Sequence, residues 1–139
     1  MELIGAMAQM AASQQAAEAH RASGEAQARA YREQAEQAES KAKDEELKRL
    51  KNLRQALASQ RAHWAAAGIS SQSGSPTTVA QSSMSNFELD QGAALINTRQ
   101  QVRSLNNSAD AAIRVGNIKA RGSLLSGVAS GVNRYNSYK

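Results

Sequence analysis

The stretch "AAAGISSQSGSPTTVA" (residues 65–80) interrupts a chain that is otherwise rich in helix-forming residues. Gly68 stands where a helix favours a left-handed residue directly after its last turn. Ser75 suits the N-cap of a following helix, and Pro76 suits its first position, because the N–H that proline lacks would have no partner there. The residues between them, up to Gly74, have the composition of a turn. We therefore predict a corner that joins two helices.

Composition favours a long helix on each side of this corner. The chain has 139 residues, and its single proline is in the corner. From about residue 6 to the corner, Gly24 is the only residue that disfavours a helix. We expect an all-α fold, a long antiparallel helical hairpin. Beyond residue 120 we expect a short weak helix or an extended tail. The expected parts are a long helical arm over 1–67, a corner loop over 68–76, a second arm over 77–120 and a basic tail containing Gly and Ser over 121–139.

The chain has little apolar area with which to stabilise a monomer. Alanine supplies 28 residues, whereas Leu, Ile, Val and Phe together supply 21 of 139. That share is below the roughly 20% that is usual for a self-sufficient globular domain. We therefore expect the hairpin to assemble with other copies of itself into a ring or tube.

Three apolar stripes are visible at helical spacing. The first has the alternating three- and four-residue steps of a heptad seam: Leu50, Leu53, Leu57, Gln60, Trp64 and Ala67. The second is a seam of small residues that permits close helix approach: Ala12, Ala19 and Ala26, beside Ala16 and Ala30. The third follows a period of about 3.6 residues on the second arm: Val79, Ser83, Phe87, Ala94, Val102, Leu105, Ala109, Ile113, Gly116 and Ala120.

Folding the two arms together predicts which residues meet. If the arms pair about the centre of the corner, residue numbers that sum to about 143 lie opposite each other. Trp64 then faces Val79, Leu57 faces Asn86 and Phe87, and Leu50 faces Ala93 and Ala94. The large apolar side chains of both arms coincide near the corner, which favours a hairpin. The expected hairpin-packing residues are Leu50, Leu53, Leu57, Trp64, Val79 and Phe87.

Charge is distributed unevenly along the chain. The formal net charge is +5, but residues 1–68 are nearly balanced, with ten basic and nine acidic groups. Beyond Asp110 there is no acidic residue. The basic residues there are candidate contacts for DNA, a membrane surface or an acidic protein: Arg114, Lys119, Arg121, Arg134 and Lys139. A purely solubilising tail explains them equally well.

No pattern in the sequence indicates catalysis, and we expect no enzyme, no metal and no cofactor. There is no cysteine, and neither His20 nor His63 has a carboxylate at the spacing of a zinc site. Glu88 and Asp90 point apart on a helix. Neither a nucleophile elbow nor a phosphate-binding loop occurs. We also expect no export signal and no membrane span, since the apolar runs are too short.

The stretch "AAAGISSQSGSPTTVAQSSMSNFELDQGAALINTRQQVRS" (65–104) resembles the internal virion proteins, or ejection proteins, of short-tailed bacteriophages. The matching positions are Gly68, Ser73, Gly74, Ser75, Pro76, Glu88, Leu89, Asp90, Ile96 and Arg99. The resemblance implies a protein packed near the portal, in contact with the portal, the tail or larger ejection proteins. It also implies that the protein is ejected to help form a channel for the genome across the host envelope.

Three alternatives remain open. The first is another head-tail or connector component of a phage. The second is a helical hairpin of a secretion apparatus, although the spacing from Trp64 to Gly68 is longer than in the small hairpin substrates of that class. The third is a basic nucleic-acid-binding protein with a coiled-coil arm, which would require its basic residues to cluster on one helical face.

Overall fold

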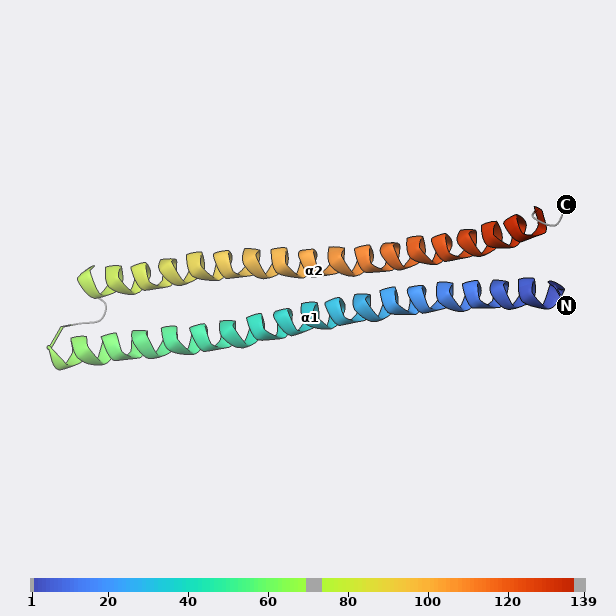
Figure 1. Ribbon diagram of the computed structural model, residues 1–139. Coiled ribbons are helices and arrows are strands. Elements are labelled where there is room, and N and C mark those ends of the chain that lie inside the picture. Colours follow the sequence, from blue (N-terminus) through green and yellow to red (C-terminus); the bar gives the residue numbers. More distant parts are fainter. Residues whose placement is uncertain (1, 70–73, 137–139) are drawn as a thin grey trace. The chain divides into compact units, whose positions relative to one another are not determined.

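The computed structural model describes residues 2–69 and 74–136, and the surroundings of side chains over 7–69 and 74–129. Two helices, α1 (Glu2–Ala66) and α2 (Gly74–Asn136), account for almost all of the described chain, in which no strand occurs (Figure 1). The all-α prediction is therefore confirmed. The chain divides into two compact units, and each pairs a segment of α1 with a segment of α2. Unit 1 combines Met1–Ala35 with Arg103–Lys139, and unit 2 is Glu36–Val102.

The corner begins with the glycine that the sequence indicates. Gly68 has a φ of 71°, and no other described residue has a positive φ. The N–H of Ile69 donates to the carbonyl of Trp64 at 2.9 Å, and the N–H of Gly68 donates to that of Ala65 at 3.0 Å. These are the two bonds of a Schellman motif, which pairs carbonyls that the end of α1 would otherwise leave free. The predicted left-handed cap at Gly68 is thus confirmed.

The second helix starts earlier than predicted. α2 begins at Gly74, so Ser75 lies inside the first turn and the prediction that it forms the N-cap is wrong. Pro76 is buried in that first turn, where its missing N–H removes no helical hydrogen bond. The hydroxyl of Thr78 donates to the carbonyl of Gly74 at 2.8 Å. Residues 70–73 lie outside the described part of the corner.

The expected tail after residue 120 is helical. α2 continues to Asn136, so the predicted end of the second arm near Ala120 is wrong. Each interior glycine costs a helix about 1 kcal/mol relative to alanine, which is why the sequence favoured a break. Gly127, however, packs against Ser13 of α1, where a Cβ would fall 2.6 Å from the Ser13 Cβ. A tertiary contact therefore offsets the weak helix propensity.

The face of α2 that packs on α1 repeats every 11 residues. In each 11-residue block the same three positions are buried or half-buried, with steps of four, three and four residues. The 11-residue period corresponds to 3.67 residues per turn, close to that of a straight helix. The stripe predicted for the second arm lies on this inner face, except for Val79. The inner-face residues are Pro76, Ala80, Ser83, Phe87, Gln91, Ala94, Thr98, Val102, Leu105, Ala109, Ile113, Gly116, Ala120, Leu124 and Gly127.

The predicted leucine seam of α1 is also on the inner face. Leu50, Leu53, Leu57, Gln60 and Trp64 are all half-buried, whereas Ala67 is exposed. Ala42, Glu46 and Arg49 continue the stripe toward the start of unit 2. From Ala42 to Trp64 the steps are four, three, four, four, three and four residues, which is the 11-residue spacing and not a heptad.

The alanine seam predicted near the N-terminus does not face α2. Ala12, Ala19, Ala26 and Ala30 are exposed, and Ala16 is half-buried. The residues that pack against α2 lie on the opposite side of α1: Ala17, Gly24, Ala28 and Ala35. With alanine at so many positions, the sequence offers two equally regular seams, and only contact with α2 distinguishes them.

The register between the helices differs by several residues from the predicted one. Glu46 accepts a hydrogen bond from Gln91 in unit 2, and Gly24 lies against Gly116 in unit 1. In both pairs the two residue numbers sum to less than 143, because α2 starts at Gly74 and the corner is centred near residue 70. Val79 is 40% exposed, so its predicted pairing with Trp64 is wrong.

Unit 1 is held together by small residues in close contact. A Cβ on Gly24 would fall 3.1 Å from the Cα of Gly116 and 2.8 Å from the carbonyl oxygen of Ala112. Only backbones without side chains between them approach so closely. The buried apolar residues of the described chain are all alanines: Ala17, Ala28, Ala35, Ala109 and Ala120. This core contributes little hydrophobic stabilisation, since an alanine side chain buries little apolar area.

Candidate functional site

The basic residues predicted to contact DNA or lipid are exposed where the structure describes them. Arg114, Lys119 and Arg121 project from α2 in unit 1. Arg134 lies within α2, but its side chain is outside the described set, as is the whole of Lys139. Arg114 and Arg121 are seven residues apart and so share one side of the helix, whereas Lys119 lies on another.

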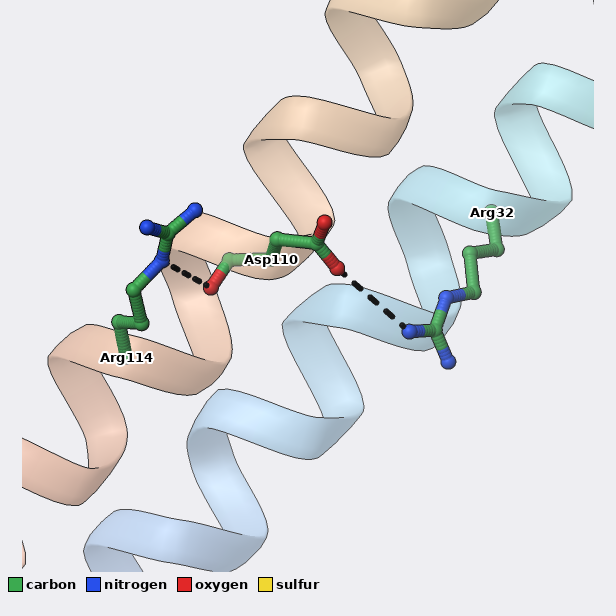
Figure 2. A network of polar contacts seen from close by, with 3 residues as sticks. All are labelled: Arg32, Asp110 and Arg114. Carbon is green, nitrogen blue, oxygen red and sulfur yellow. Dashed lines mark hydrogen bonds and ion pairs between the residues drawn. The ribbon is translucent and has the colours of Figure 1, made fainter.

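One polar network links the two helices of unit 1 (Figure 2). Arg32 of α1 approaches Asp110 of α2 with 3.9 Å between Nη2 and Oδ1, and the two side chains are 54% and 59% exposed. Arg114 donates from Nε to the main-chain carbonyl of Asp110 at 3.4 Å. Because water screens both charges, an ion pair of this kind contributes at most about 1 kcal/mol. The network orients Arg114 along the helix and leaves much of its guanidinium open to solvent.

Large apolar side chains are exposed on α2 in both units. In unit 1 these are Val115, Ile118, Leu125 and Val128, and in unit 2 Leu89 and Ile96 stand out, with exposures of 72% and 56%. They lie outside the stripe predicted for the second arm, which is on the side that faces α1. Their own regular spacing, with Ile118 and Leu125 seven residues apart, was the available signal.

The predicted packing residues of unit 2 form a loose apolar contact. Leu50, Leu53, Leu57, Trp64 and Phe87 are half-buried, and none of the described large side chains is fully buried. The rings of His63 and Trp64 meet edge to face, with centroids 6.2 Å apart. Arg49 lies on the same inner stripe, and its Nε atom is buried without a hydrogen-bond partner.

The described residues bring together no group of three or more His, Cys, Asp or Glu side chains that could hold a metal ion. His20 lies in unit 1 and His63 in unit 2. Several hydroxyls bond to carbonyls of their own helix, as Thr98 does to Ala94 at 2.9 Å and Ser108 to Ser104 at 2.9 Å. This local bonding lets polar residues occupy the inner face of α2.

Neither helix, over its described residues, contains a stretch long and apolar enough to cross a membrane. Over its described residues, α2 carries exposed apolar side chains and exposed basic side chains. Together with the corner, they are the features of the described chain on which an interaction can depend.

Comparison with protein-family models, with curated proteins and with solved structures finds no match for the chain.

Proposed function

We propose that this protein is a structural subunit that works as an assembly, and that it belongs to the ejection machinery of a short-tailed bacteriophage. The observation that carries the first part is the contrast between core and surface. The buried apolar residues of the described chain are five alanines, whereas Ile118, Leu125 and Leu89 are each more than two-thirds exposed. A chain of this kind needs further copies or partners to bury its large apolar side chains.

The phage assignment rests on the resemblance of residues 65–104 to internal virion proteins. The matching positions include the corner glycine, Gly68, and the "ELD" stretch of α2, Glu88 to Asp90. In this proposal the protein lies in the virion near the portal, beside the portal, tail or larger ejection proteins. On infection it leaves ahead of the genome and helps to form a channel across the host envelope.

Helical architecture with a small core is consistent with transport through a narrow tail. Two helices whose buried apolar residues in unit 1 are alanines have little buried apolar area to lose on separation. The exposed basic residues Arg114, Lys119 and Arg121 can contact DNA phosphates in the virion or anionic lipid headgroups at the host envelope.

The mass and helicity of the purified chain test this proposal. Light scattering and circular dichroism are measured with and without vesicles of anionic lipid, over a range of protein concentrations. Assembly into particles of defined mass, or a gain of helicity and mass on vesicles, supports an assembling virion component. A compact chain of 14.8 kDa that stays monomeric and ignores lipid at every concentration would overturn it.

A further inference from the structure

The side of α2 that faces away from α1 in unit 1 carries a second regular apolar stripe. Its positions alternate in steps of four and three residues, as in a heptad seam. Ile118 and Leu125 are 68% and 71% exposed, and Val115 is 48% exposed. Arg114 and Arg121 border this stripe, and no acidic residue follows Asp110 in the sequence. We call this stripe the α2 outer face: Ala111, Val115, Ile118, Gly122, Leu125 and Ala129.

The outward side of α1 in the same unit has the opposite character. Its stripe has the same four- and three-residue steps, consists of small residues apart from Gln15, and is exposed throughout. Glu18 and Glu25 border it, seven residues apart, as Arg114 and Arg121 border the stripe on α2. We call this stripe the α1 outer face: Ala8, Ala12, Gln15, Ala19, Ala22 and Ala26.

We propose that the α2 outer face of one copy packs on the α1 outer face of a second copy. Large side chains then meet small ones, which allows close packing between helices. The acidic border of one copy meets the basic border of the next. Pairing two α2 outer faces would instead set Arg114 and Arg121 against the same arginines, with no acid on that face to offset them.

The register of this contact follows from the borders. In an antiparallel pair of helices with heptad seams, the residues that directly precede the first seam position of each heptad lie opposite one another. Arg114 and Arg121 stand at such positions on α2, and Glu18 and Glu25 stand at such positions on α1. Arg121 therefore meets Glu18 when Arg114 meets Glu25. The same register sets Ile118 beside Ala19.

Within a few residues, this is the register that Gly24 and Gly116 have inside one copy. Neighbouring copies therefore lie side by side with little axial shift. Because the two outer faces lie on opposite sides of unit 1, the contact is heterologous, and it closes into a ring where the rotation from one copy to the next divides a full turn. This inference rests on the proposed assembly and names the surface through which it forms.

Cysteine cross-linking tests the contact directly, because the native chain has no cysteine. In the double variant Ala19→Cys, Ile118→Cys, the two thiols of one copy lie on opposite sides of unit 1 and cannot reach each other. Mild oxidation should give a ladder of covalent oligomers on a denaturing gel. The matched control is Ala19→Cys, Leu89→Cys, in which Leu89 is 72% exposed but lies outside the α2 outer face. This control should give no ladder.

Charge reversal provides a second test, with rescue. Glu18→Arg, Glu25→Arg and, separately, Arg114→Glu, Arg121→Glu should each raise the concentration needed for assembly by about tenfold or more, since each sets like charges together. An equimolar mixture of the two variants should assemble again, because every contact then joins opposite charges. The matched control Arg54→Glu, Arg61→Glu changes two exposed arginines that are also seven residues apart, in unit 2.

The outcomes separate this inference from the proposed function. A ladder together with rescue by mixing supports the contact. Assembly of normal mass without a ladder, or without sensitivity to either charge reversal, overturns the contact and leaves the assembly proposal standing. A chain that is monomeric at all concentrations and on lipid overturns both.

Discussion

Gly24 of α1 and Gly116 of α2 approach so closely that a Cβ on either residue would fall 3.1 Å from the Cα of the other. The relation is reciprocal: the same Cβ on Gly24 would meet the carbonyl of Ala112 at 2.8 Å, and one on Gly116 would meet that of His20 at 2.8 Å. These contacts involve backbone atoms, which cannot rotate away as a side chain can. The close approach therefore depends on glycine at both positions.

Gly24→Ala and Gly116→Ala should each destabilise the hairpin. A methyl group here overpacks the contact, at about 1–3 kcal/mol, which exceeds the roughly 1 kcal/mol that alanine gains over glycine in a helix. Thermal unfolding followed by circular dichroism measures the change. Gly92→Ala is the control, because a Cβ at that position would meet nothing within 4 Å. It should raise the melting temperature, and an equal effect at all three sites would contradict the close contact.

Gly68→Val should destabilise the corner. At a φ of 71° the backbone is left-handed, and a side chain with a Cβ there costs about 1–2 kcal/mol, with more for a β-branched residue. The measurement is the free energy of unfolding in urea. Gly74→Val is the matched control, because Gly74 lacks a positive φ and has open space around it. If both variants lose equal stability, the cost lies in helix propensity and not in the left-handed cap.

Arg49→Leu should stabilise unit 2. The Nε of Arg49 is buried without a partner, and an unsatisfied buried polar atom costs about 1–3 kcal/mol. Leucine continues the apolar inner stripe formed by Leu50 and Leu53. A higher melting temperature is expected, and the control Arg54→Leu, at an exposed position, should change it much less. A drop in stability at position 49 would show that the guanidinium is satisfied in solution.

Asp110→Asn should change stability by less than about 0.5 kcal/mol. The ion pair with Arg32 spans 3.9 Å between side chains that are more than half exposed, and exposed pairs contribute little. Unfolding is measured at low and high salt, with Arg32→Gln and the double variant completing a thermodynamic cycle. A coupling free energy well above 1 kcal/mol would contradict this prediction.

Much of the fold could be predicted from the sequence, because local chemistry specifies it. Gly68 is favoured at a left-handed position whatever surrounds it, and the 3.6-residue spacing of Phe87, Ala94 and Val102 marks one side of a helix. Where α2 ends could not be predicted. Gly127 is a weak helix former on its own, and only its contact with Ser13 reveals its role.

The candidate interaction surface was harder to predict, for a related reason. Ala12, Ala19 and Ala26 form as regular a stripe as Ala17, Gly24 and Ala28, and alanine suits an inner or an outer face equally. The choice depends on where Gly116 allows α2 to approach. The residue pairs near the corner were misplaced because register follows from where α1 ends and α2 starts, and an earlier start of α2 moves every pairing along the hairpin.

The 11-residue repeat of the inner face also sets the lengths to which the hairpin can be cut or extended. Eleven residues make three full turns of helix at this period, so Phe87 and Thr98 of α2 face the same way. Removing 11 residues from each helix of unit 2 therefore keeps the remaining inner-face positions on one side of the helix. Removing seven would rotate one part of each helix against the other by part of a turn. Natural or engineered variants should therefore differ in length by blocks of 11 residues, with the same number of blocks added to or removed from each helix.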